Sequence, residues 1–128
     1  MNIFLWVLQV ILGVYFFYTG ILHFTLPPGL PTQMIWMYEL PWGLHVFSGI
    51  VEILAGLGLI LPGLTKIQTR LTPLAALGLV LVMIVAAVWH FSRNEPANIM
   101  MNFILATLCG FVAYARWKIR PLKTRANS

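Results

Sequence analysis

Residues 48–64 read SGIVEILAGLGLILPGL and contain one charged side chain, Glu52, among apolar and small residues. The next charge along the chain is Lys66. Such a segment suits the inside of a bilayer, where a spanning helix needs about 20 mostly apolar residues. A carboxylate near the bilayer centre costs at least about 2.5 kcal/mol on insertion scales. Glu52 therefore requires a partner, a bound proton or a functional role.

The whole chain shares this composition. Of its 128 residues, 60% are hydrophobic and 9% are charged, whereas a soluble domain carries about 25% charged residues. We therefore expect one integral membrane domain spanning residues 1–128. The first apolar segment has neither a basic leader nor a small-residue cleavage site, so we interpret it as a retained helix. The single cysteine, Cys109, excludes an internal disulfide and a CxxC redox pair.

Prolines divide the chain into four apolar segments, predicted as helices over residues 3–24, 43–61, 72–91 and 98–117. We expect the second helix to end before Pro62. The third opens with Thr72-Pro73, a hydroxyl cap followed by proline in the first turn, and Asn94-Glu95-Pro96 precedes the fourth by the same logic. Because backbone amides within lipid must be satisfied inside the protein, the fold class is an all-α membrane four-helix bundle.

The basic residues predict the orientation of the bundle. With four spans, the second loop and the C-terminal region lie on one side, and they hold seven of the eight Lys and Arg residues: Lys66, Arg70, Arg116, Lys118, Arg120, Lys123 and Arg125. Only Arg93 lies on the other side. This bias places both termini in the cytoplasm (N-in, C-in). We interpret residues 118–128 as a basic cytoplasmic tail that contacts anionic lipid, with no role in nucleic-acid binding.

The first loop, residues 25–42, is long for a connection between helices. It contains MIWMYEL, residues 34–40, which is apolar but too short to span a bilayer. One interpretation is a short interfacial helix over the outer mouth of the bundle. The other is an aromatic-rich loop without a lid function.

Most of the polar side chains within the helices fall in the predicted outer half. The candidate catalytic residues are Glu52, as a proton relay, with His45 and His23. The candidate cavity residues are Tyr18, Thr19, Ser48, Gly49, His90, Asn98 and Asn102. Residues 45, 48, 49, 52 and 56 recur at helical spacing and line one face of their helix. We expect a cavity that opens outward beneath residues 32–40, and an apolar inner half.

Depth along the helices predicts the contacts of Glu52. If the outer ends of the first two helices are level, His23 lies about 15 Å and His45 about 10 Å from Glu52, at 1.5 Å rise per residue. Water or Tyr18 is then the expected neighbour of the carboxylate. With no Lys or Arg at its depth, we expect Glu52 to be protonated at pH 7, because burial disfavours the charged form.

Four motifs resemble the DoxX-like family: GILHF (residues 20–24), SGIVEILAGLGLILPGL (48–64), LTPLAALGLVLVMI (71–84) and EPANIMMN (95–102). They occur in the family's order along nearly the whole chain. The resemblance implies a small four-helix protein of the bacterial cytoplasmic membrane. The family takes its name from subunits of a thiosulfate:quinone oxidoreductase, and some relatives belong to redox-stress complexes or act as assembly chaperones. Many members carry Lys where this chain has His23.

The resemblance and the polar residues together give three functional hypotheses. The first is a subunit or accessory of a quinone-linked membrane oxidoreductase, with a quinone or small polar molecule as ligand and no intrinsic cofactor or metal. The second is a non-catalytic assembly chaperone or interaction protein, which would pack against a partner membrane protein or a second copy. The third is a small transporter, which the apolar inner half disfavours because transport needs access from both sides.

The predicted orientation can be tested with reporter fusions. A reporter fused after Ser128 should give a cytoplasmic signal, and one inserted between Pro27 and Pro31 should give a signal from the opposite side, because an odd number of spans separates the two positions. If both reporters give a signal from the same side, the predicted number of spans is wrong.

Overall fold

The computed structural model describes residues 2–124. Its elements are α1 (Asn2–Thr25), the 3₁₀ helix η1 (Thr32–Tyr38), α2 (Trp42–Thr65), α3 (Leu71–Ser92), α4 (Pro96–Tyr114) and the π-helical turn η2 (Ala115–Ile119), which continues α4. Within the described residues, four helices are long and apolar enough to cross a membrane, the last combining α4 with η2. The prediction of an all-helical chain with four membrane-spanning helices is therefore confirmed.

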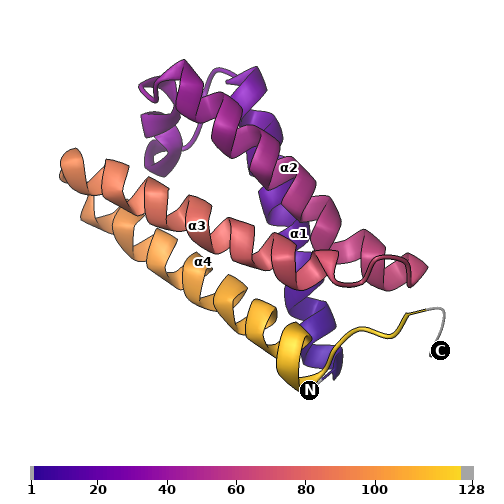
Figure 1. Ribbon diagram of the computed structural model, residues 1–128. Helices are drawn as coiled ribbons and strands as arrows, with labels where there is room; N and C mark the ends of the chain where they lie inside the picture. Colours follow the sequence, from indigo (N-terminus) through magenta and orange to yellow (C-terminus); the bar gives the residue numbers. More distant parts are fainter. Residues whose placement is uncertain (1, 125–128) are drawn as a thin grey trace.

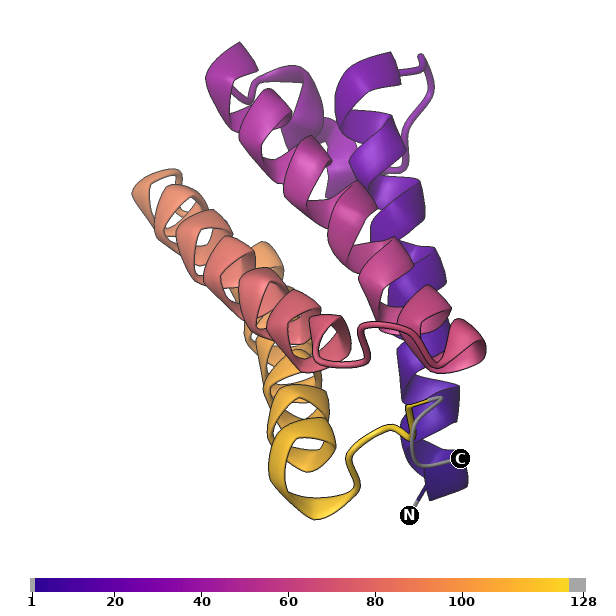
Figure 2. The ribbon, with the colours of Figure 1, turned by 45° about the vertical axis from the view of Figure 1, so that its right-hand side comes forward.

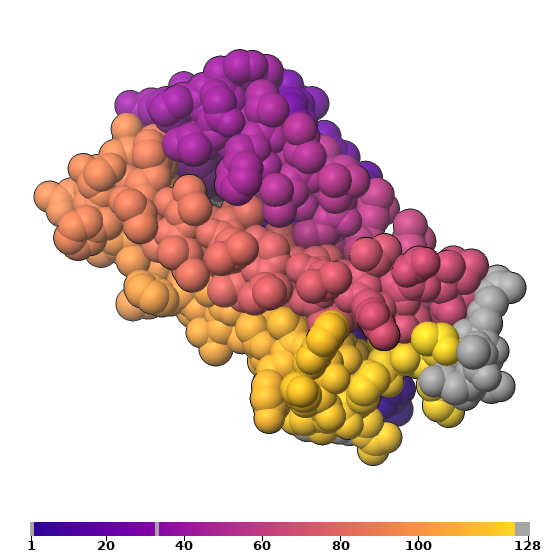
Figure 3. Space-filling model, viewed as in Figure 1, coloured from indigo at the N-terminus to yellow at the C-terminus, as the bar shows by residue number. Residues whose placement is uncertain are grey.

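The four long helices form two antiparallel pairs, α1 with α2 and α3 with α4 (Figure 1). The pairs lie closest together at the end that holds the chain termini, and they diverge toward the end that holds the α1–α2 loop, as Figure 2 shows from a second side. On the face seen in Figure 3, α3 lies between α2 and α4. Buried apolar side chains from all four helices meet in one core: Leu12, Phe16, Ala55, Leu59, Ala76, Leu79, Val82, Met83, Cys109 and Val112.

Opposed glycines let α1 and α2 approach closely. A Cβ atom on Gly56 would lie 2.7 Å from the carbonyl oxygen of Gly13, and one on Gly20 would lie 3.0 Å from the carbonyl oxygen of Gly49. The backbones therefore pack directly against each other, as small residues permit between membrane helices. Since the two contacts are seven residues apart on each helix, they fix both the register and the rotation of the pair.

The second helix does not end at Pro62, contrary to the sequence-based prediction. It continues to Thr65 and is terminated by Lys66 in a left-handed conformation, with φ 60°. Proline has no N–H to donate to the carbonyl four residues earlier, that of Gly58. The Thr72 hydroxyl donates to this oxygen at 2.7 Å. Because another helix satisfies the freed carbonyl, the proline is tolerated inside the span.

The same contact corrects the predicted helix caps. Thr72 was expected to cap α3, but its hydroxyl donates to the Gly58 carbonyl of α2. The helix α3 begins after Arg70 without a side-chain cap. Glu95 at the start of α4 also makes no side-chain cap. Instead, α3 and α4 each have a proline in the first turn, Pro73 and Pro96 respectively, where a missing N–H costs nothing.

The glycine contact between α1 and α2 predicts a sharp difference between two alanine substitutions. Gly56→Ala should destabilise the protein by about 1–3 kcal/mol, because the added methyl meets backbone atoms of α1 that cannot move independently. Gly78→Ala is the matched control, since the nearest atom to its Cβ is Val51 Cγ1 at 4.0 Å. Thermal unfolding in detergent should show a lower Tm for Gly56→Ala only. Equal Tm values would mean that the two helices do not pack this tightly.

Candidate functional site

Four side chains from α1 and α2 form a buried, hydrogen-bonded series. The Thr19 hydroxyl donates to Glu52 Oε1 at 2.5 Å, and Glu52 Oε2 lies 3.2 Å from His23 Nε2. His23 Nδ1 is 2.9 Å from His45 Nδ1. None of the four is more than 7% exposed. We call Thr19, Glu52, His23 and His45 the polar cluster.

The structure corrects the predicted distances within the polar cluster. Sequence reasoning took the outer ends of the first two helices as level and therefore separated His23 from Glu52 by about 15 Å. The glycine contacts shift α2 by about one turn, so that residue 20 lies against residues 49 and 53. This register brings Thr19 level with Glu52, and the long His23 and Glu52 side chains close the remaining distance. The neighbours of Glu52 are thus Thr19 and His23, not Tyr18.

The geometry of the polar cluster constrains where its protons lie and what its total charge is. Two facing Nδ1 atoms can form a hydrogen bond only if one carries a proton and the other offers a lone pair. One proton lies between Glu52 Oε2 and His23 Nε2, and a second, on His23 Nδ1, is donated to His45 Nδ1. With these two protons, every polar atom of the series has a partner. The cluster is then uncharged in total, whether the first proton resides on the carboxyl group or on the imidazole. A neutral cluster is the form that a low-dielectric interior favours.

The 3₁₀ helix η1 covers the end of the polar cluster nearest the α1–α2 loop. The Trp36 ring lies 6.3 Å from the His23 ring and packs edge-on against His90 of α3 at 4.7 Å. Met37 is 1% exposed, and its backbone hydrogen-bonds His45. A short helix does form in the predicted loop, and it links the cluster to the second helix pair.

Ionic contacts attach η1 to the turn between α3 and α4. Arg93 Nη2 donates to Glu39 Oε1 at 2.6 Å, and Arg93 Nε donates to Glu95 Oε1 at 3.1 Å. His90 Nδ1 lies 2.8 Å from the same Glu95 oxygen. Burial alone would raise the pKa of Glu95, but hydrogen bonds from His90 and Arg93 outweigh it and hold that pKa below its ordinary value. His90 therefore belongs to this ion-pair group, and the Trp36 ring lies against both His90 and His23.

The other predicted cavity residues lie outside the polar cluster. Tyr18 is 56% exposed on the surface of α1. Ser48 is half-buried on α2, and Gly49 is covered by the Phe24 ring. Asn98 is half-buried in the first turn of α4, and Asn102 is buried one turn later, with an Nδ2 that has no hydrogen-bond partner among the described residues.

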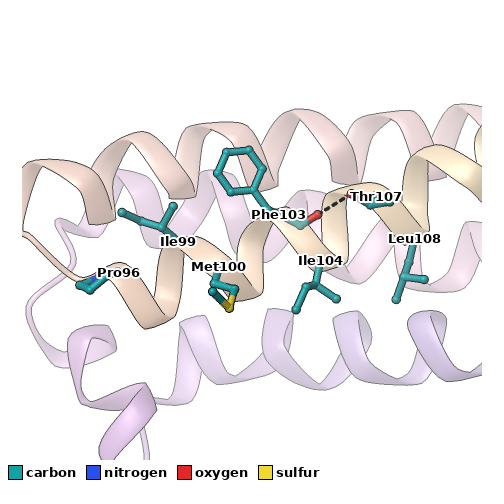
Figure 4. Close-up of a pocket in the computed structure, with 7 residues that line it drawn as sticks. All are labelled: Pro96, Ile99, Met100, Phe103, Ile104, Thr107 and Leu108. Atoms are coloured by element: carbon teal, nitrogen blue, oxygen red, sulfur yellow. Dashed lines mark hydrogen bonds between the residues drawn. The ribbon is translucent and has the colours of Figure 1, made fainter.

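Two surface grooves involve α4 and not the polar cluster. One, of about 520 Å³, is lined by seven residues of α4 alone, shown in Figure 4: Pro96, Ile99, Met100, Phe103, Ile104, Thr107 and Leu108. The other, of about 290 Å³, lies between α3 and α4 and includes Asn102. Both are almost entirely apolar. Within residues 2–124, no three His, Cys, Asp or Glu side chains are grouped so as to hold a metal ion.

Sequence reasoning missed a second buried polar group, at the opposite end of the molecule. Gln9 and Arg116 are 0% and 2% exposed, although an apolar inner half was expected. Arg116 Nε donates to Gln9 Oε1 at 2.5 Å, and Gln9 Nε2 donates to the Leu59 carbonyl at 2.8 Å. The available signal was Gln9 itself, an amide in the middle of an apolar segment, because such groups normally face the protein interior.

Comparison with protein families matches residues 7–112 to the DoxX-like family. The match includes the polar cluster and all of α2 and α3, and it ends before Arg116. No curated protein and no solved structure matches the chain.

The proton shared by Glu52 and His23 should be detectable by infrared spectroscopy. We expect a carboxylic C=O stretch at neutral pH that disappears in Glu52→Gln. That variant should keep the wild-type Tm, because the amide can donate to His23 Nε2 and accept from Thr19 as a protonated carboxyl group does. Glu39→Gln, which removes an exposed carboxylate, should leave the band unchanged. An absent band together with an unfolded Glu52→Gln would mean that Glu52 and His23 form an ion pair.

Proposed function

Because this chain belongs to the DoxX-like family and carries a buried hydrogen-bonded series from Thr19 to His45, we propose that it is a proton-relay subunit of a quinone-linked membrane oxidoreductase. The observation that carries the proposal is the continuity of the series, in which each group contacts the next at hydrogen-bonding distance. A carboxyl group and two imidazoles are the side chains best suited to accept and release protons near neutral pH.

The chemistry of the relay follows from its atoms. Reduction of a quinone takes up two electrons and two protons, and oxidation of the quinol releases them. In this proposal a partner redox protein supplies or removes the electrons, and Glu52 exchanges protons with the quinone oxygen. A proton leaving Glu52 binds His23 Nε2, the proton on His23 Nδ1 passes to His45 Nδ1, and His45 releases its other proton toward η1.

The same proposal assigns the orientation. Seven of the eight basic residues lie in the α2–α3 loop and the C-terminal region, so both termini face the cytoplasm of a bacterial inner membrane. His45 and η1 then lie toward the outer surface, and Glu52 is the deepest member of the relay. Protons accordingly exchange with the outer side of the membrane. The apolar core, which surrounds Leu59 and Leu79, separates the relay from the cytoplasmic side.

A non-catalytic role is the alternative, and one observation favours it. Only 17% of the most apolar window of the fourth span is buried within the chain, against 44% for α1. A partner membrane protein could cover this face of α4. An assembly chaperone or interaction protein would use that surface and would not need the polar cluster to exchange protons.

Electrode-induced infrared difference spectroscopy separates the two roles. With a short-chain ubiquinone added to the purified protein, reduction should perturb the Glu52 carboxyl band in the wild type and in Glu39→Gln. Glu52→Gln should lose the perturbation, and His23→Phe should reduce it, because the proton then has no route to His45. A carboxyl band that does not respond to quinone reduction would contradict the relay. Stoichiometric co-purification of another membrane protein would then support the interaction role.

A further inference from the structure

The π-helical turn η2 directs Arg116 into the protein at the end that holds the chain termini. The turn spans Ala115–Ile119, and Ala115 and Arg116 are both buried within it. The Arg116 guanidinium lies 5.8 Å from the centre of the Trp6 ring. A π-turn changes the angular position of each following side chain, and such turns are frequent at functional sites.

Among the residues that the structure describes, all the hydrogen-bond acceptors of Arg116 are uncharged. Nε donates to Gln9 Oε1, and Nη1 donates to Asn2 Oδ1 at 2.7 Å and to the Arg120 carbonyl at 2.9 Å. Nη2 is buried without a hydrogen-bond partner among the described residues. Arginine cannot escape burial by losing its proton. The guanidinium is therefore a permanent charge with one unused donor group.

The chain has no acidic side chain available to neutralise this charge. Its three acidic residues are Glu39, Glu52 and Glu95. Glu52 is in the polar cluster, and the other two are paired with Arg93 at the opposite end. Arg120 adds further positive charge to the surroundings of Arg116. A buried charge without a counter-ion is strongly destabilising, so the guanidinium requires an anion that the side chains of residues 2–124 do not supply.

We propose that Arg116 is the centre of a binding site for one phosphate group, supplied by the headgroup of an anionic phospholipid. A guanidinium matches phosphate in geometry and in charge, and a phosphate oxygen at Nη2 would use the remaining donor. The site lies where α1 and α4 meet the membrane interface, between Trp6 and the basic residues that follow η2. Lys and Arg clusters at this level attract anionic lipid. Arg116 follows the matched family region, residues 7–112, and the site shares no residue with the polar cluster, so the proposal is independent of the proton relay.

Lipid nanodiscs allow the site to be tested against general surface attraction. We expect phosphatidylglycerol, compared with phosphatidylcholine alone, to raise the Tm of the wild type and of Lys118→Gln, an exposed charge removed two residues away. Arg116→Gln should lose this rise, and its retention of phosphatidylglycerol in native mass spectrometry should fall about tenfold, as expected for a lost charge-assisted hydrogen bond. A Tm rise that persists in Arg116→Gln would show diffuse attraction and overturn the proposal.

Two further measurements cover the remaining outcomes. Inorganic phosphate added in detergent should stabilise the wild type less than phosphatidylglycerol does, and equal stabilisation would assign the site to a free anion. If Arg116→Gln does not fold, lipid retention by the wild type tests the proposal. The wild type should retain one phosphatidylglycerol in preference to phosphatidylcholine. Wild-type protein that retains both lipids equally would overturn the proposal.

Discussion

The close approach of α1 and α2 through opposed glycines determines where the polar residues meet. The contacts of Gly13 with Gly56 and of Gly20 with Gly49 fix the register of the two helices. That register places Thr19 beside Glu52 and brings His23 within reach of both Glu52 and His45. A shift of one residue along α2 would rotate Glu52 by about 100° and turn it away from its partners. The chemistry of the site therefore depends on the absence of side chains at four positions.

Much of the fold could be predicted from the sequence, because hydropathy and prolines act locally. Four apolar segments predict four helices, since lipid leaves the backbone few alternatives. One exception was Pro62, where a local rule predicted a helix end. The structure satisfies the carbonyl of Gly58 with a hydroxyl fourteen residues away in sequence, from Thr72. A hydrogen-bond donor that another helix supplies cannot be predicted from the local sequence pattern.

The candidate site was predicted in its composition but not in its geometry. Glu52, His23, His45 and Thr19 could be selected because polar groups in a span avoid lipid. Their contacts depend on the relative depth of two helices, and a difference of one turn changes a distance by about 5 Å. Arg116 could not be selected, because a basic residue at the end of a span normally faces water. Its burial results from a π-turn, which has no simple sequence pattern.

The distribution of the polar cluster along the chain bears on how this protein enters the membrane. Thr19 and His23 precede Glu52, and all three belong to the first helical hairpin. During synthesis, the acid that is most costly to insert therefore meets its partners as soon as its own helix enters the bilayer. The two spans of the first hairpin can be inserted with an uncharged polar cluster before α3 is made. The carbonyl of Gly58 differs, because its donor, the Thr72 hydroxyl, belongs to the third helix. This carbonyl lies close to the cytoplasmic end predicted for α2, where water can hydrogen-bond to it until α3 is made.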